Sequence, residues 1–299
     1  MFAPVYSSIT PMTARILAAQ PLVEQLKKNL RQRCDVLKSR GVVPSMSVVL
    51  VGNNPASLSY IRNKKRMCEE VGANFSLFQL PDSTTESAFF KHLEQLNADP
   101  SVHGIIIQLP VSEHLKKLNL SDLVAPHKDI DGFHSQNTKA LYMGTTNLNL
   151  LLPCTPKGIV HLLHYYKVPI SGKHAVVIGR SLIVGKPLTM LLSNLNATVT
   201  LAHSKSDDIQ NFTRNADIVI CAVGKAKFLN HKHFEASRKT TVIDVGMNTV
   251  DGKLAGDVDF DEVKTIVEAI SPAPGGVGPM TVVTLIENLI TATENQLKG

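Results

Sequence analysis

The sequence predicts an α/β protein of two domains, each built on a parallel sheet. In the first half, apolar runs of strand length alternate with segments of helical spacing. In the second half, an apolar run ends at a glycine turn that opens a helix. Because strands that alternate with helices pair in parallel, each half is expected to carry helices on the faces of its sheet. The 299 residues are enough for two domains of ordinary size.

The first half is expected to read helix, strand, helix, strand, helix and strand. The last of these strands contains Ile105-Ile106-Ile107, a run typical of a strand buried on both faces. Ser83 or Thr84 is the expected cap of the third helix. The expected ranges, in that order, are 21–37, 48–51, 58–71, 75–80, 86–96 and 103–109.

The second half carries four further strand signals, at 175–178, 197–201, 218–223 and 241–245. Between the halves, Pro153 and Pro156 favour an extended joint and then a helix with Thr155 as its cap and Pro156 as its first residue. We therefore expect one domain over 1–152, joined by the C-terminal helix at about 281–299, and a second domain over 153–280.

The composition narrows the class of partner. Lys and Arg number 31 against 25 for Asp and Glu, which gives a formal charge of +6. No basic run is interleaved with aromatic residues and Trp is absent, so we expect an anionic small molecule rather than nucleic acid. No apolar stretch approaches the roughly 20 residues of a membrane span. The four cysteines form no C-x-x-C pair, which suggests reduced thiols in a cytoplasmic protein.

The segment from Ala175 to Leu192 predicts a dinucleotide-binding strand–turn–helix. The strand stops at Gly179, the polar residues Arg180 and Ser181 follow, and Gly185 opens the helix. Glycines let the backbone approach a pyrophosphate, and a helix N-terminus presents N–H groups and partial positive charge to it. The spacing departs from G-x-G-x-x-G, so a turn that binds no phosphate is the alternative.

The next strand signal ends at His203-Ser204-Lys205, where NAD enzymes commonly carry an acidic residue for the ribose hydroxyls. No acid stands there. Arg180 and Ser204, with Lys205 as a further candidate, instead offer charge and hydrogen bonds to a 2′-phosphate. The sequence therefore favours NADP over NAD, and the alternative is an exposed loop without a ligand.

Tyr60 and Lys64 are four residues apart and so share one face of a helix. A lysine against apolar walls can lose enough pKa to exchange protons near neutrality, Gln108 can orient its amine, and a tyrosine ring can stack on a flat substrate. Both Gln108 and this helix follow strands that end at one sheet edge, where ligands collect. The alternative is a solvated basic face, since 62–66 is rich in Lys and Arg.

The segment Asp129-Ile130-Asp131-Gly132 leaves three interpretations open. Its spacing lacks the further ligands of a calcium loop, so we expect no metal. It is typical of a turn closed by its own side-chain-to-backbone hydrogen bonds. Alternatively, a carboxylate here accepts two N–H bonds from a guanidine-like ring edge such as that of a pterin.

Taken together, eight segments resemble the bifunctional methylenetetrahydrofolate dehydrogenase/cyclohydrolase family. They run in order from about residue 47 to the end, and Met1–Arg40 resembles the family least. The segments are Tyr60-Ile61-Arg62-Asn63-Lys64-Lys65, Gln108-Leu109-Pro110, Lys128-Asp129-Ile130-Asp131-Gly132-Phe133, Pro153-Cys154-Thr155-Pro156-Lys157-Gly158, Gly179-Arg180-Ser181-Leu182-Ile183-Val184-Gly185-Lys186-Pro187, Ile243-Asp244-Val245-Gly246, Gly256-Asp257-Val258 and Pro274-Gly275-Gly276-Val277-Gly278-Pro279-Met280-Thr281.

The resemblance implies oxidation of 5,10-methylenetetrahydrofolate to the methenyl cation with NADP, followed by hydrolysis to 10-formyltetrahydrofolate, in the one-carbon metabolism that serves purine biosynthesis. It also implies a Rossmann-type NADP domain over 153–280, a folate-binding catalytic domain over 1–152 with the last helix returned to it, and a homodimer paired through the cofactor domains. Two alternatives are a dehydrogenase without cyclohydrolase activity and a binding module that has lost its chemistry.

The resemblance also assigns roles. Lys64 is the catalytic lysine, Tyr60 stacks on the folate, Gln108 tunes the lysine and Asp131 holds the pterin. Arg180 and Ser204 bind the 2′-phosphate. The full set of expected substrate-binding residues is Tyr60, Gln108, Leu109, Pro110, Asp131, Pro274, Gly275 and Gly276. The expected cofactor-binding residues are Gly179, Arg180, Ser181, Val184, Gly185, Pro187, His203, Ser204, Gly278 and Thr281.

Overall fold

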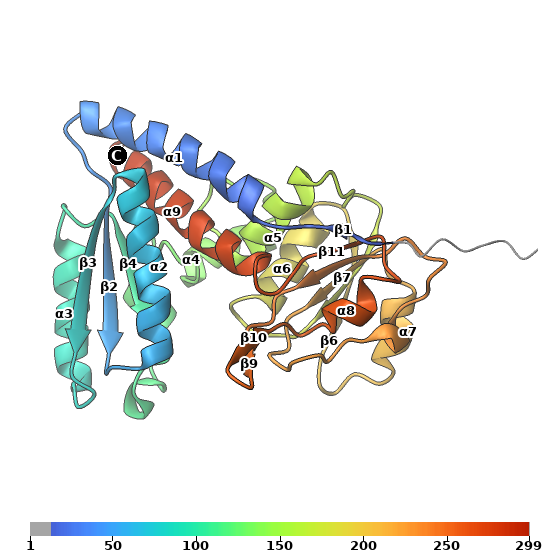
Figure 1. The fold of residues 1–299 in the computed structure, drawn as a ribbon. Helices are drawn as coiled ribbons and strands as arrows, with labels where there is room; N and C mark the ends of the chain where they lie inside the picture. The colour runs from blue at the N-terminus through green and yellow to red at the C-terminus, as the bar shows by residue number, and fades with distance from the viewer. Residues whose placement is uncertain (1–12, 299) are drawn as a thin grey trace, which may run out of the picture.

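Two parallel sheets lie side by side, with long helices between them (Figure 1). The structure is a computed structural model that describes residues 13–298. A three-stranded sheet occupies the first half of the chain and a six-stranded sheet most of the second, and a small antiparallel hairpin is attached to the latter. The α/β class predicted from the sequence is confirmed.

The first sheet has the order β3-β2-β4, all parallel, with β2 (Ser45–Val51) in the centre. β3 (Asn74–Leu80) and β4 (Gly104–Gln108) flank it. The helices α2 (Pro55–Val71) and α3 (Glu86–Ala98) connect them. β2 is buried along almost its whole length, which explains its continuous apolar run, whereas β3 is an edge strand that alternates between exposed and half-buried positions.

The caps of these helices refine the sequence prediction. α2 begins three residues earlier than expected, because the Asn54 side chain accepts hydrogen bonds from the N–H groups of Ala56 and Ser57 and Pro55 occupies the first position. The proposed caps of α3, Ser83 and Thr84, are wrong. Thr85 caps the helix through the Ala88 N–H at 3.3 Å, while the Thr84 hydroxyl turns back to the Pro81 carbonyl.

The second sheet has the order β1-β11-β8-β7-β5-β6. Its four long strands confirm the predicted ones and are β5 (His174–Ile178), β6 (Thr198–Ala202), β7 (Ile218–Cys221) and β8 (Thr241–Asp244). The hairpin pairs β9 (Asn248–Val250) with β10 (Lys253–Ala255). The helices around this sheet are α6 (Gly185–Asn194), α7 (Ile209–Arg214), α8 (Phe260–Val263) and the 3₁₀ turn His231–His233.

Two short strands at the edge of this sheet were missed. β1 (Arg15–Ile16) pairs in parallel with β11 (Ala269–Ile270), which pairs with β8. Strands of two residues are too short for any periodicity in the sequence. Residues 15 and 16 therefore belong to the second sheet, although the predicted division assigns 1–152 to the first domain. The chain then leaves this sheet for α1 (Gln20–Ser39).

Three helices lie between the sheets: α1, α5 (Cys154–Tyr165) and α9 (Val277–Gln296), and α9 packs against the other two and against α2 (Figure 1). α9 starts four residues before the predicted position. The predicted start of α5 is wrong by two residues, since the helix begins at Cys154. Thr155 is already helical, and its hydroxyl bonds that of Thr281 at 3.0 Å instead of capping.

The largest apolar core is shared by both halves, since it joins side chains of α1, β2 and α2 to those of α5, β5 and α9. The remaining short elements after β4 are the 3₁₀ turns Glu113–Leu115 and Leu120–Leu123 and the helix α4 (Ser135–Tyr142). Among the described residues, no helix combines the length and apolarity that a membrane span requires.

Candidate active site

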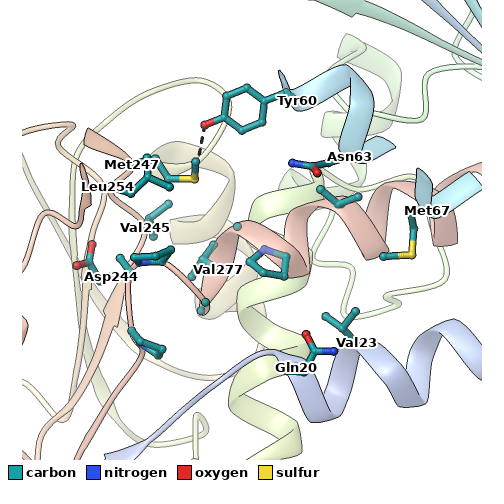
Figure 2. A pocket seen from close by; sticks show the side chains of 18 of the residues that line it. Gln20, Val23, Tyr60, Asn63, Met67, Asp244, Val245, Met247, Leu254 and Val277 are labelled. Carbon is teal, nitrogen blue, oxygen red and sulfur yellow. Dashed lines mark hydrogen bonds between the residues drawn. The ribbon is translucent and has the colours of Figure 1, made fainter. Parts of the chain in front are cut away.

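Two cavities of about 430 Å³ each meet between the sheets. The lysine cavity lies at the end of β4 and is lined by Lys64, Gln108 and Asp131. The glycine cavity lies beside it, between Pro272–Pro279 and side chains of α1 and α2, and Figure 2 shows it. The two share a set of lining residues, so they are adjacent. The shared residues are Tyr60, Val245, Met247, Val277, Gly278 and Val282.

Lys64 and Gln108 form a direct pair across the lysine cavity. Lys64 Nζ, on α2, donates a hydrogen bond of 3.0 Å to Oε1 of Gln108, the last residue of β4. Gln108 Nε2 donates to the Leu109 carbonyl at 2.9 Å. Because an ammonium only donates, the amide oxygen must face the lysine, and the carbonyl of Leu109 fixes the other end of the amide. The ammonium is thereby held in one place with further protons to offer to the cavity.

The basic stretch around Lys64 divides into two faces. Arg62, Lys65 and Arg66 are exposed, whereas Lys64 is half-buried. Lys65 and Arg66 lie near glutamates one turn later on α2, which is the usual arrangement of a solvated helix face. The alternative interpretation from sequence thus holds for the neighbours of Lys64 but not for Lys64 itself.

Tyr60 lies one turn before Lys64, at the boundary of the two cavities. Its side chain is 40% exposed, and its hydroxyl donates to Met247 Sδ at 3.5 Å (Figure 2). Partial burial raises the pKa of the phenol, so it remains protonated at neutral pH. The ring is a flat, accessible surface between the sheets.

The structure separates the two carboxylates of Asp129-Ile130-Asp131. Asp129 closes its own turn, with hydrogen bonds from the N–H groups of Gly132 (3.0 Å) and His134 (2.8 Å) and from Asn137 Nδ2 (2.9 Å). The turn interpretation is therefore confirmed for Asp129. Asp131 instead lines the lysine cavity.

Burial raises the pKa of Asp131 to about 6, the Lys64 charge lowers it in part and the Asp129 charge raises it further. No described residue donates a hydrogen bond to the Asp131 carboxylate. Asp131 thus offers both carboxylate oxygens to a ligand. Among the described residues, no group of His, Cys, Asp or Glu side chains is arranged to hold a metal ion.

Apolar side chains form most of the remaining wall of the lysine cavity. They come from both halves of the chain: from β4, from the segment after Leu120, from the loop before α6 and from α9. Such walls exclude water and strengthen the electrostatic interactions of Lys64 and Asp131. The apolar residues are Ile105, Ile106, Ile107, Leu120, Val124, Phe133, Ile183, Val184 and Leu285.

At the six-stranded sheet, the predicted phosphate residues meet at one edge. β5 and β6 are parallel neighbours with Ile178 opposite Ala202, so Gly179-Arg180 and His203-Ser204 leave adjacent strand ends. The Gly179 N–H donates to the Ala202 carbonyl at 2.9 Å. Arg180, Ser204 and Lys205 are exposed. His203 stabilises its own loop, because its Nδ1 accepts a hydrogen bond of 3.2 Å from the Lys205 N–H.

The glycines of the turn before α6 are required by close packing. A Cβ at Gly185 would overlap the carbonyl oxygen of Gly179, and one at Gly179, where φ is +117°, would overlap the Ala222 carbonyl. The helix therefore begins directly against the end of β5. Pro187 is buried in its first turn.

The backbone N–H groups that are free to bind an anion lie in the loop 180–183 and not in the first turn of α6. The Ser181 side chain accepts from the N–H groups of Val184 and Gly185, and its carbonyl accepts from that of Lys186. Within residues 13–298, no acceptor is found for the backbone N–H groups of 180–183. These free N–H groups, the helix N-terminus and the Arg180 charge together suit a phosphate.

The other predicted residues fall into three places. Leu109 lines the lysine cavity, with Pro110 next to it in the chain, and Thr281 and Val184 also line it. Pro274, Gly275 and Gly276 line the glycine cavity, and Gly278 lines both. The phosphate residues line neither cavity, and they are Gly179, Arg180, Ser181, Gly185, Pro187, His203 and Ser204.

Sequence reasoning missed the residues that follow β8. Val245 and Met247 line both cavities and Met247 contacts Tyr60. Their loop is shaped by Asp244, which accepts the N–H groups of Gly246 and Asp257 at 2.9 Å and whose pKa burial raises to about 6. The signal was present, since the rule that ligands collect beyond parallel strand ends applies equally to the strand at 241–245.

Comparison with known proteins gives two matching family models. The tetrahydrofolate dehydrogenase/cyclohydrolase catalytic domain matches residues 17–131, and the NAD(P)-binding domain of the same name matches residues 153–297. The chain is 42% identical to the bifunctional protein FolD of Halalkalibacterium halodurans, over 95% of this chain and 100% of the relative. It is 43% identical to FolD of Geobacillus thermodenitrificans, over 94% of this chain and 98% of the relative.

Solved structures agree. The bifunctional FolD dehydrogenase/cyclohydrolase of Campylobacter jejuni superimposes with a TM-score of 0.91 at 39% identity, over 94% of this chain and 99% of that one. The Trypanosoma brucei methylenetetrahydrofolate dehydrogenase-cyclohydrolase, complexed with NADP cofactor and inhibitor, gives a TM-score of 0.90 at 31% identity, over 96% and 99%.

Proposed function

The chain belongs to the tetrahydrofolate dehydrogenase/cyclohydrolase family, and we propose that its lysine cavity is the place where both reactions of that family occur. It is a bifunctional enzyme that acts on methylenetetrahydrofolate as dehydrogenase and cyclohydrolase. The products in this proposal are 5,10-methenyltetrahydrofolate and then 10-formyltetrahydrofolate. The observation that carries it is the Lys64–Gln108 pair, which faces Asp131 within one apolar cavity.

In this proposal the pterin lies in the lysine cavity. The Asp131 carboxylate, to which no described residue donates a hydrogen bond, accepts the N–H groups of the pterin ring edge. The ring of Tyr60 stacks on the flat part of the substrate. Because Tyr60 borders both cavities, the rest of the folate extends past it into the glycine cavity along Pro274–Gly276.

The first reaction requires mainly positioning. Its reacting carbon lies between two nitrogens whose lone pairs stabilise the cation, so no strong acid or base is needed. Bound NADP supplies the acceptor for the hydride. The chain's own contribution is to hold the pterin through Asp131 and Tyr60 and to exclude water with the apolar wall.

The second reaction requires a proton carrier, and Lys64 Nζ is the group placed for it. Oε1 of Gln108 accepts a hydrogen bond of 3.0 Å from the ammonium, which leaves its other N–H groups free to point into the cavity. In its neutral form the amine accepts a proton from the attacking water, and as ammonium it returns one to the departing nitrogen. The remaining hydroxyl proton leaves to solvent as the formyl carbonyl forms. The Lys64 charge also favours the ionised form of Asp131.

For the cofactor, the second half is the NAD(P)-binding domain, and we favour NADP over NAD. The support is the exposed side chains of Arg180 and Ser204 at adjacent strand ends and the free N–H groups of 180–183. No carboxylate follows β6 before Asp207. Equal use of NAD and NADP by the unaltered enzyme would contradict this preference.

Three parts of the account stay predictions. The division into 1–152 with the C-terminal helix and 153–280 is kept, apart from the strand at residues 15–16. A homodimer through the cofactor domains is supported by the position of β6, which ends the six-stranded sheet with an outer edge that pairs with no other described strand. A cytoplasmic location rests on the cysteine pattern of the sequence alone.

The test compares Lys64→Met with Lys65→Met. Lys65 is the adjacent residue, with a side chain 56% exposed on the solvated face of α2, so it is a matched control. Turnover is followed by absorbance from methylenetetrahydrofolate with NADP and, separately, from the methenyl compound alone. In Lys64→Met we expect cyclohydrolase activity to fall at least about 100-fold, the range of a lost proton carrier, and the dehydrogenase rate to fall far less.

Undiminished hydrolysis in Lys64→Met would refute the assignment of the proton carrier. An equal loss in Lys65→Met would show that the effect comes from the helix rather than from the cavity. Absence of the 10-formyl product in the unaltered enzyme would instead support the monofunctional alternative.

A further inference from the structure

We propose that Asn288 is a positioning residue for Asp131, because its single buried amide fixes the backbone on both sides of that carboxylate. This inference rests on the proposed role of Asp131 in holding the pterin. Asn288 lies in the middle of α9 and is fully buried. It does not line the lysine cavity, and so acts only through the residue that does.

The first contact fixes the peptide plane that precedes Asp131. Asn288 Nδ2 donates to the Ile130 carbonyl at 2.8 Å, and the thiol of Cys154 donates to the same oxygen at 3.3 Å. The carbonyl of Ile130 and the N–H of Asp131 belong to one planar peptide unit. Holding that oxygen therefore limits the direction in which the Asp131 side chain leaves the backbone.

The second contact fixes the segment on the other side. The same Nδ2 donates to the Leu152 carbonyl at 2.9 Å. Gly132, with φ of +76°, packs so closely on this carbonyl that a Cβ would overlap it. The NH₂ group of Asn288 therefore binds the carbonyl of Ile130, which precedes Asp131, and the carbonyl of Leu152, against which Gly132 packs.

The orientation of the amide is set by a buried ion pair. Lys157 Nζ, with no exposed surface, donates to Asn288 Oδ1 at 2.9 Å, and a lysine can only donate. The NH₂ group must therefore face the two carbonyls. Glu287 balances the lysine charge at 2.9 Å and also contacts His161 at 3.1 Å. These partners hold the pKa of Glu287 down at about 2, so it is ionised.

Packing alone does not require the buried polar cluster of Glu287, Lys157 and Asn288. Apolar residues often replace a buried ion pair without loss of stability, so the pair is weak evidence of a stabilising role. Here the contacts run from Glu287 to Lys157, from Lys157 to Asn288, and from Asn288 to the Ile130 carbonyl in the peptide unit that precedes Asp131. The geometry is that of a support for the pterin-binding carboxylate.

The test is Asn288→Asp, which has nearly the same shape and keeps an acceptor for Lys157 but turns two donors into acceptors that face carbonyls. We expect the KM for the folate substrate to rise about tenfold or more in both reactions, while the KM for NADP stays within about twofold. Asn288→Ser is measured in the same way, because its shorter side chain cannot reach both carbonyls and it introduces no charge.

The matched control is Thr293→Val on the same helix. Thr293 is also fully buried, and its hydroxyl donates to the Leu289 carbonyl at 2.8 Å, within α9 itself. This variant is expected to lower the Tm with the folate KM unchanged. A folate KM that rises equally in Thr293→Val would show a general effect of α9 and would overturn the inference.

A double-mutant cycle tests the positioning role of Asn288 separately from the binding role of Asp131. Asp131→Asn alone should raise the folate KM, and in that background Asn288→Asp should add little, because its route of action is gone. Additive effects would overturn the positioning role of Asn288 while leaving the proposed function intact. An unchanged folate KM in Asp131→Asn would refute the role of Asp131 itself.

Discussion

Replacing Asp131 by Asn should stabilise the enzyme while it impairs the binding of the folate substrate. The carboxylate lies against apolar walls and accepts no hydrogen bond from residues 13–298, so its ionised form is unfavourable in the free enzyme. An amide of the same shape removes the charge and keeps the volume. The same change removes the acceptor for the pterin N–H groups, so the folate KM should rise.

The magnitude follows from the pKa of Asp131. Raising it from 3.8 to about 6 corresponds to about 3 kcal/mol at about 1.36 kcal/mol per pKa unit. Because the cleft is open and the side chain is only partly buried, solvent screens part of this energy, and we expect a gain of about 1–3 kcal/mol at neutral pH. For a chain of this size that is a rise in Tm of about 2–6 °C.

The sign of the pH dependence is fixed by linkage. Between pH 3.8 and about 6 the folded state holds the Asp131 proton more tightly than the unfolded state, so this group makes stability fall as pH rises through that window. The gain in Asp131→Asn should be complete above pH 6, shrink as pH falls and vanish below 3.8. Thermal unfolding of both proteins at several pH values measures it.

Asp129→Asn is the matched control in the same loop. Asp129 accepts three hydrogen bonds, and an amide would turn N–H groups toward N–H donors, so this variant should be destabilised. Equal Tm values for Asp131→Asn and the parent above pH 6, or a gain that persists below pH 3.8, would refute the electrostatic argument.

Two further predictions concern the cofactor site. Arg180→Ala should raise the KM for NADP about tenfold and leave that for NAD nearly unchanged, because only the 2′-phosphate needs the guanidinium; equal effects on both cofactors would contradict the phosphate site. Gly185→Ala should cost about 1–3 kcal/mol and weaken NADP binding, because its Cβ overlaps the Gly179 carbonyl and must push α6 from β5. Thermal unfolding and cofactor titration measure the latter, and an unchanged Tm with unchanged affinity would show that the close approach is not required.

The long elements of the fold could be predicted because their signals are local. Apolar runs predicted β2 and β5 through β8, and the prolines at 153 and 156 predicted that a helix starts there, as α5 does within two residues. The strands β1 and β11 could not be found, since two residues carry no period and their pairing is set by partners about 250 positions away. Several predicted helix starts were off by one to four residues, because a Ser or Thr near a helix start need not cap it: Thr85 caps α3 in place of its neighbours, and α5 has no side-chain cap.

The sequence allowed the types of residue in the candidate site to be predicted. It did not show which of two similar neighbouring residues faces the cavity, because that depends on the folded structure. Spacing placed Lys64 on a helix face but could not tell it from the exposed Lys65. It could not separate Asp129, which closes a turn, from Asp131, which lines the cavity. Asn288 gave no signal at all, because its role depends on two carbonyls more than 130 residues earlier in the chain.

The structure of the enzyme with NADP and a folate analogue tests the central claim most directly. The account predicts the pteridine in the lysine cavity, with its N–H edge on the Asp131 carboxylate, its ring against Tyr60 and Lys64 Nζ within hydrogen-bonding reach. A pteridine bound in the glycine cavity alone, or on the far side of the cofactor from Lys64, would contradict it.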